Sequence, residues 1–516
     1  MPPVYQFGQS LPQAPDLYVN IVPPRTILIN GIPTGILGLV GVASWGPVNA
    51  PMVIGDPQTA AQSLGNVTFR SHDLATACAL AFGEFVTQIA AVRVTDGTDA
   101  AATVTLMDTE TTPVAGLTLT AKYTGIAGNT ITAQFAAGTA ANSYKLIIQR
   151  AGYTPEIFDN LTGTGNALYV NAATAVTNGQ NGVRGPSSIV TAAAGAGTGA
   201  PNTATTYTMA GGADGASGVT DAILLGADGT TRTGMYSLRG SNASNITLAD
   251  HTTSTHWPAI LSFAEQIGAY AHVANPPSTS ITASAAAMVS AGVDGYGIKV
   301  LAGDWGYFYD SFNGVQRMLS PATWSAAKGA SLIPPYSNLN KRMFTMVATQ
   351  RSQTQIPYSS AEIQQAFTSR LDLIASDSPG GPYFSARTGL NTSSNPTQND
   401  DTYTKMTNYL AFSLAQSALG AVVGQPHTAD LRKETKGGLD GFLLSQFQQG
   451  WIGDPNNPTA QGAFNVQCDA KNNPPTRVAL GYLQADVTVK YLNTVRFFVV
   501  NMEGGGSVTV TSSAPQ

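Results

Sequence analysis

Charged side chains are scarce in this sequence of 516 residues, where 25 Lys and Arg and 30 Asp and Glu make up only 11% of the chain. Soluble domains usually carry roughly 25% charged residues. The formal net charge of −5 is small for this length, so we expect no nucleic-acid partner. Because proteins usually depend on surface charge to stay soluble as monomers, the composition suggests surfaces that are covered by partners.

Cysteine and histidine are also rare. The two cysteines, Cys78 and Cys468, are too few for a disulfide scaffold or a zinc cage built from cysteine. Cys78 lies on the apolar face of a predicted helix, where an inert packed thiol is expected. None of the five histidines has zinc-site spacing, and we expect His251 and His256, in a Thr-rich stretch, to be solvated. The sequence therefore predicts no metal or other cofactor.

Motifs of common catalytic sites are missing as well. The sequence contains neither a Gly-x-x-x-x-Gly-Lys-Ser/Thr phosphate loop nor a Gly-x-Ser-x-Gly elbow. The two carboxylates of a catalytic pair can come from distant positions in a sequence, so the sequence alone does not exclude such a pair. No pattern here selects one. The apolar stretches at residues 35–43 and 410–424 are too short to span a membrane. We therefore expect a protein that is not an enzyme and does not insert into a membrane.

A strand–helix–strand pattern is present near the N-terminus. Residues 36–42 form a continuous apolar run that predicts a buried strand. After a short helix that ends at Gly65, Asp73 is expected to cap a second helix with one apolar face. That helix is expected to lead directly into a second buried strand at residues 90–94. A unit of this kind is typical of α/β packing.

The middle of the chain changes character twice. Residues 96–209 are rich in Thr, Ala, Gly and Asn and predict a β-rich domain with strands at residues 103–106, 117–120, 130–135 and 144–149. Residues 191–206 have low complexity and predict a mobile loop or linker. A mixed pattern then returns, with helices expected at residues 257–268 and 280–291 and strands at residues 270–273 and 297–301.

The last quarter predicts helices at residues 360–375 and 403–423. Two strands at residues 478–489 and 495–502 are separated by a turn-length link, which indicates an antiparallel hairpin. Each end of the chain offers one short, detached strand. Prolines flank the patch at residues 17–22 and favour an extended arm, and a Gly-Gly-Gly hinge precedes the alternating residues 507–511.

Several stretches together resemble the tail sheath proteins of contractile-tailed bacteriophages and of related contractile injection systems. They are GIPTG from Gly31, LVGVA from Leu39, WGPVNAP from Trp45, AGGADG from Ala210, and GAFNVQCDAKNN from Gly462 with the strands that follow. The last cluster is the most specific. The resemblance covers residues 30–95 and 400–505 best, and residues 96–209 correspond to the variable outward-facing insertion of that family.

The resemblance implies a multidomain α+β and α/β fold. It would comprise an extended N-terminal arm (1–30), an α/β core segment (31–95), a β-rich outer insertion domain (96–209), an α/β middle domain (210–395), a C-terminal inner sheath domain (396–503) and a strand-donating C-terminal arm (504–516).

The resemblance also implies a structural role. Sheath subunits stack as rings, commonly sixfold, into a helical homopolymer around a tail tube, and the sheath contracts to drive the tube through the host envelope. Its partners would be further copies of itself, the tail tube protein, and baseplate and tail terminator proteins, in the virion tail after assembly in the host cytoplasm. The alternative is a β-rich phage surface or receptor-binding protein, such as a tail fibre or adhesin, although the repeats or shaft expected of an adhesin are not seen.

The same resemblance implies roles for specific residues. The strands donated to neighbouring subunits would be Tyr18, Val19, Asn20, Ile21 and Val22, and Ser507, Val508, Thr509, Val510 and Thr511. The receiving sheet would be the predicted C-terminal hairpin, with Leu483, Ala485, Val487, Val489, Phe497 and Val499. The densest basic cluster, Arg432, Lys433 and Lys436, is a hypothetical contact with the tail tube, and a solvated charge cluster is the alternative.

Overall fold

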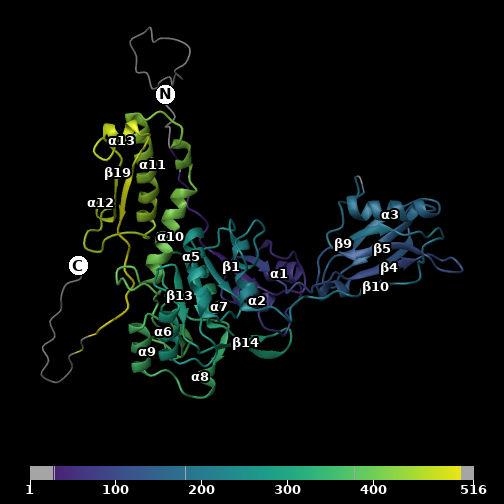
Figure 1. The fold of residues 1–516 in the computed structure, drawn as a ribbon, viewed down its shortest axis with the longest axis horizontal. Helices are drawn as coiled ribbons and strands as arrows, with labels where there is room; N and C mark the ends of the chain where they lie inside the picture. Colours follow the sequence, from purple (N-terminus) through teal and green to yellow (C-terminus); the bar gives the residue numbers. More distant parts are fainter. Residues whose placement is uncertain (1–26, 28, 181, 377, 501, 503–516) are drawn as a thin grey trace, which may run out of the picture. The chain divides into compact units, whose positions relative to one another are not determined.

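The computed structural model describes residues 27, 29–180, 182–376, 378–500 and 502 (Figure 1). The chain forms two compact units, of which the larger spans Pro33–Asn408 and Asn493–Gln516 and the smaller spans Met1–Ile32 and Tyr409–Leu492. The predicted donor strands at residues 18–22 and 507–511 lie outside the described residues.

A six-stranded sheet forms the centre of the larger unit. Its order is β13 (Ile298–Leu301), β12 (Tyr270–Ala274), β11 (Asn245–Leu248), β1 (Ile36–Gly41), β3 (Gln88–Arg93) and β2 (Pro51–Ile54). All neighbours pair in parallel except β2, which pairs antiparallel with β3 at the edge. Every residue of β1 is buried, as expected where helices cover both faces of a parallel sheet.

Helices pack on both faces of this sheet. Alternate residues of β1 divide between two clusters, with Ile36 and Val40 in one and Leu37 and Leu39 in the other. The first cluster contains buried residues of α5 (Trp257–Ile267) and α6 (Ile281–Ser290), and the second contains those of α2 (Leu74–Gly83) and α7 (Pro321–Ser331). The strands and helices expected from residues 257 to 301 are confirmed, with small differences at their ends. The elements expected from residues 36 to 94 are confirmed too, but α2 ends at Gly83 and does not lead directly into β3, and the edge strand β2 was not expected.

Local capping explains why the early helices begin where they do. In α1 (Pro57–Leu64), Pro57 occupies the first turn and the Asp56 carboxylate accepts from the backbone N of Thr59. In α2, Asp73 accepts from the backbone N of Thr76. Cys78 is buried in α2, as its position on the apolar face indicates.

The β-rich region contains two sheets and one helix. The expected strands are confirmed as β4 (Thr103–Met107), β5 (Ala115–Ala121), β6 (Thr132–Ala137) and β7 (Tyr144–Gln149). They are completed by β8 (Glu156–Leu161), β9 (Val190–Ala194), β10 (Tyr207–Thr208), the 3-10 helix η1 (Ile126–Thr130) and α3 (Asn166–Asn178). The expected loop at residues 191–206 is wrong at its start, because four of its residues belong to β9, which pairs with β5.

Shorter elements complete the larger unit. They are α4 (Asp221–Leu225), η2 (Gly234–Leu238), η3 (Ser254–His256), β14 (Gly306–Asp310), β15 (Val315–Leu319), β16 (Met346–Thr349), α8 (Gln350–Gln353), α9 (Ser360–Thr368), β17 (Ile374–Ala375) and β18 (Ser385–Ala386). The helix expected at residues 360–375 therefore ends at Thr368, because residues 374–375 pair with β18. His251 is buried, contrary to expectation, and its Nε2 lies 3.0 Å from Nδ1 of His256.

The smaller unit is mostly helical. The helix α10 (Asp401–Ala415) begins in the larger unit and continues into the smaller one. The remaining elements are η4 (Ala418–Val422), α11 (Ala429–Gln448), α12 (Ala460–Ala463), β19 (Phe464–Gln467), α13 (Pro475–Ala479) and β20 (Asp486–Val489). No described helix is long and apolar enough to cross a membrane.

The predicted C-terminal hairpin is wrong. Strand β20 pairs antiparallel with β19, and residues 492–500 contain no strand. Pro475 starts the short helix α13, and Gly481, at φ 79°, turns the chain after it. Asn473 then fixes the approach to β20, because its side chain exchanges two hydrogen bonds with the backbone of Gln484.

Candidate assembly site

The segment that follows the smaller unit exposes an unusual run of apolar side chains. Residues 492–500 contain neither helix nor strand. Large side chains between 68% and 90% exposed follow one another here: Val495, Phe497, Phe498, Val499, Val500 and Met502. A contiguous apolar run on a surface marks an interaction site. Phe497 and Val499, predicted to lie in a receiving sheet, belong to this segment instead.

Polar contacts hold the start of this segment against other parts of the larger unit. Arg496 Nη2 donates to Asp400 Oδ2 over 2.9 Å and to Asn399 Oδ1 over 3.2 Å. Thr494 Oγ1 donates to the other oxygen of Asp400 over 3.1 Å. The ring of Phe497 also lies 6.0 Å from that of Phe367 in α9. The exposed run therefore starts from a defined anchor, the Asp400 carboxylate.

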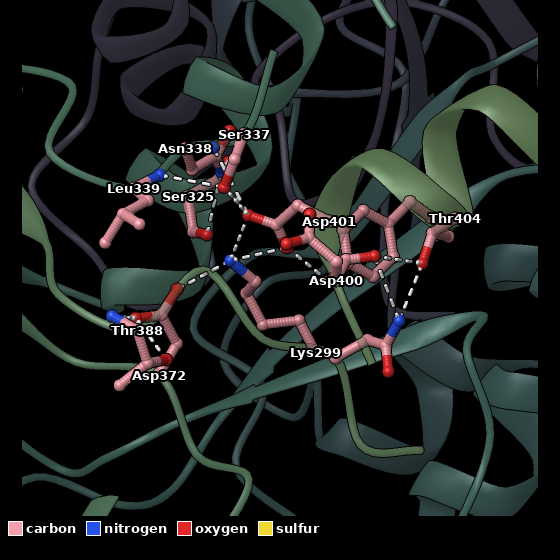
Figure 2. A network of polar contacts seen from close by, with 12 residues as sticks. Lys299, Ser325, Ser337, Asn338, Leu339, Asp372, Thr388, Asp400, Asp401 and Thr404 are labelled. Carbon is pink, nitrogen blue, oxygen red and sulfur yellow. Dashed lines mark hydrogen bonds and ion pairs between the residues drawn. The ribbon is translucent and has the colours of Figure 1, made fainter. Parts of the chain in front are cut away.

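The neighbouring carboxylate, Asp401, points into the core and joins a buried ionic network (Figure 2). Lys299 Nζ, from β13, lies 2.6 Å from Asp372 and 2.9 Å from Asp401, and the side chains of Lys299 and Asp372 are 0% exposed. Asp401 also accepts from Ser337 Oγ and from the backbone N of Asn338. Because a buried charge is tolerated only when it is paired and hydrogen-bonded, this network fixes the first turn of α10 on the sheet.

Electrostatics keep Asp401 and Lys299 charged. Burial raises the pKa of Asp401, but Lys299 and the hydroxyl of Tyr270, which donates over 2.7 Å, outweigh it and lower the pKa to about 2. Burial lowers the pKa of Lys299, but Asp372 and Asp401 outweigh it and raise that pKa. Asp372 is further held by Thr388, whose backbone N and hydroxyl both donate to it (Figure 2).

A second buried lysine lies one turn along α10. Lys405 Nζ donates to the carbonyl oxygens of Leu332 and Tyr336, each over 3.1 Å. Burial lowers the pKa of Lys405 to about 7; the Asp401 carboxylate opposes this shift and the Lys299 ammonium adds to it. Lys405 is therefore the buried group of this cluster that changes its charge near neutral pH.

The adjacent residues Asp400 and Asp401 therefore bind different partners at the start of α10. Asp401 binds the core, and Asp400 binds the exposed C-terminal segment. No three His, Cys, Asp or Glu side chains among the described residues gather as a metal site requires.

The predicted receiving residues divide between two places. Val487 and Val489 lie in β20, paired with Val466 and Phe464 of β19, and Leu483 and Ala485 lie in the connection that precedes β20. Among the described residues, β19 and β20 pair only with each other. Each strand therefore keeps one edge on which a further strand could form main-chain hydrogen bonds.

The basic cluster lies on a helix that the sequence interpretation missed. Arg432, Lys433 and Lys436 belong to α11, whose buried residues recur at helical spacing: Thr435, Leu439, Phe442, Leu443 and Gln446. Lys436 pairs with Asp440 at 2.6 Å and Lys433 with Asp430 at 3.7 Å. The cluster is therefore largely balanced by acids of its own helix.

Comparison with known proteins shows a likeness in structure but not in sequence. No protein-family model matches the chain, and no curated protein matches it. Solved structures match over nearly all of its length. The sheath tail protein of Listeria innocua aligns with a TM-score of 0.58 at 15% identity, covering 86% of this chain and 90% of its own.

The fold is that of the sheath tail proteins. The sheath tail protein of Desulfitobacterium hafniense gives a TM-score of 0.55 at 16% identity, covering 88% of this chain and 93% of its own. The sheath of PVC, an extracellular contractile injection system, solved in its contracted state, gives 0.54 at 8% identity and covers 96% and 99% of the two chains. The resemblance seen in the sequence is confirmed at the level of the fold.

Replacing Lys299 should destabilise the protein strongly. In Lys299→Met, the carboxylates of Asp372 and Asp401 stay buried without their cation, so we expect the free energy of unfolding to fall by about 3–5 kcal/mol. The matched control is Lys436→Met, which removes an exposed Lys–Asp pair with the same 2.6 Å separation. That change should cost about 0.5 kcal/mol or less. Urea unfolding measures both, and equal losses would show that the buried network is not the anchor of α10.

Stability should depend on pH through Lys405. Its pKa is about 7 in the folded protein and 10.5 as the unperturbed value, so between these pH values the unfolded chain binds the additional proton. The free energy of unfolding should therefore rise as the pH increases, by up to about 2 kcal/mol between about pH 7 and about pH 9. Lys405→Met should remove this part of the rise. Urea titrations at both pH values compare the two proteins, and an unchanged pH dependence in the variant would contradict the assignment.

Proposed function

We propose that this chain is the structural subunit of a contractile tail sheath, stacking as rings around a tail tube and contracting to drive that tube through a host envelope. The observation that carries the proposal is the match along the whole chain, which covers 96% of this protein and 99% of the sheath subunit of PVC. A partial match would leave room for an unrelated protein that shares one domain. Nearly complete coverage of both chains argues for the same kind of subunit.

The exposed C-terminal segment supports self-assembly. A run of apolar side chains from Val495 to Met502 is a liability for a monomer, and its anchor on Asp400 holds the run at a defined starting point. We propose that this segment, with the donor strands at residues 18–22 and 507–511, adds to sheet edges of neighbouring subunits. The edges of β19 and β20, including Val487 and Val489, are the proposed receiving surface.

The proposed partners follow from this role. They are further copies of the chain, the tail tube, the baseplate and the tail terminator, in a virion tail or a related particle. One of the structural neighbours belongs to the baseplate of the anti-feeding prophage, with a TM-score of 0.51 at 9% identity and a coverage of 96% of this chain. A role in contraction would need no catalytic site, because the energy would come from repacking between two assembled states.

Electron microscopy of the concentrated protein tests the proposal. We expect hollow, striated cylinders in negative stain, because the subunit would polymerise through its own arms. A protein that stays monomeric at high concentration would count against a sheath and favour the tail fibre or adhesin alternative.

Removal of the C-terminal arm should abolish polymers but not folding. Deletion of residues 507–516 and, separately, Val499→Asp should each leave the thermal unfolding of the subunit unchanged while preventing cylinders. The matched control is Val423→Asp, since Val423 is 87% exposed but lies outside the segment. Normal cylinders from the truncated protein would contradict strand donation.

The tube contact is a separate proposal, placed on α11. Reversing the charges of Arg432, Lys433 and Lys436 to Glu should weaken assembly on isolated tail tubes and leave tube-free polymers intact. Because Asp430 and Asp440 already balance two of these cations, we expect a modest effect, of roughly tenfold or less in the protein concentration needed. Sedimentation with and without tubes measures it, and an equal effect on both polymers would refute the assignment.

A further inference from the structure

A cavity of about 220 Å³ lies within the larger unit, where the β-rich region meets the residues that precede it. One side comes from α1 and the loop after it, and the other from η1 and the turn after β7. Its polar lining includes Ser44, Gln58, Asn66, Thr68 and Thr130, and Arg150 is the one charged residue that lines it. The cavity is large enough for a small ligand group together with ordered water.

The guanidinium of Arg150 is held in a fixed position. Arg150 is 3% exposed, and its Nη1 donates to the carbonyl oxygen of Gln62 over 3.0 Å and to the hydroxyl of Tyr153 over 2.8 Å. Its Cζ lies 4.4 Å from the ring centroids of both Trp45 and Tyr153. Burial lowers the pKa of Arg150.

This buried cation lacks an anion. Among the described residues, no carboxylate lies within 4 Å of Arg150, and the hydrogen bonds of its guanidinium to Gln62 and Tyr153 both come from Nη1, on one edge of the group. Arg184, which also stacks on an aromatic ring of the β-rich region, differs in having Glu156 at 3.4 Å. An unpaired buried charge is costly, and an oxyanion is the group that matches a guanidinium edge.

We propose that this cavity binds an oxyanion, a carboxylate or a phosphate group, through the free edge of Arg150. The neutral side-chain amides of Gln58, Gln62 and Asn66 in the lining supply further hydrogen-bond donors without introducing a repelling charge. The oxyanion could belong to a free small molecule or to an acidic side chain of a second copy of this chain. The latter source rests on the proposed self-assembly, and the former is independent of it.

Binding of inorganic phosphate tests the first source. Titration of phosphate at constant ionic strength, followed by calorimetry and by the fluorescence of Trp45, should give saturable binding to the wild-type protein. Arg150→Gln should weaken this binding at least tenfold, and Arg184→Gln should leave it unchanged.

A second variant covers the case in which Arg150→Gln fails to fold. Thr130 is exposed at the rim of the cavity, so Thr130→Glu should fold normally with Arg150 in place. The new carboxylate would occupy or repel the site, and phosphate binding should again fall at least tenfold. Thermal unfolding of each variant establishes that it is folded.

Self-association tests the second source. If the oxyanion is an acidic side chain of another copy, Arg150→Gln and Thr130→Glu should raise the protein concentration needed for polymerisation at least tenfold, measured by light scattering, and Arg184→Gln should not. Phosphate binding without any polymers would support the cavity and contradict the sheath. Two results would overturn the proposal. In the first, the wild-type protein binds no phosphate, and neither Arg150→Gln nor Thr130→Glu changes self-association. In the second, both variants still bind phosphate as the wild type does.

Discussion

The position of α10 depends on one buried cation, the ammonium of Lys299 between Asp372 and Asp401. Buried charges must be paired, and each partner here comes from a different part of the chain: the strand β13, the segment before β17 and the start of α10. The network adds to the backbone hydrogen bonds between Asp372 and β13, and it ties the start of α10 to both.

The structure shows where some of the few charged residues of the sequence lie. Several of its few charged residues lie inside the protein: Arg93, Arg150, Lys299, Lys405 and Asp401 are all buried. The surface is correspondingly poor in charge, and the exposed C-terminal segment is apolar. Such surfaces suit a subunit that packs against copies of itself, because neutral contacts can be exchanged without leaving a buried, unpaired charge.

Prediction from the sequence succeeded where local signals decide the structure. Asp73 caps α2 because its side chain reaches the backbone N of Thr76, three residues away, and that pattern is visible in the sequence. The prediction of a C-terminal hairpin failed because the alternating pattern competes with two local signals. Pro475 starts a helix, and the side chain of Asn473 binds the backbone of Gln484. Helix α11 was missed because Gly437, Gly438 and Gly441 weaken the local helical signal, whereas its buried face packs in the folded unit.

Local pattern and composition were enough to predict the α/β core, the strands of the β-rich region, the shortage of charge and the resemblance to sheath proteins. The ionic network, the anchor at Asp400 and the cavity around Arg150 became visible only in the folded chain. Lys299 and Asp401 are about a hundred residues apart, and Arg150 reaches Gln62 across a similar separation. No periodicity or motif encodes a pairing at that range, since it arises only when the folded chain brings these side chains together.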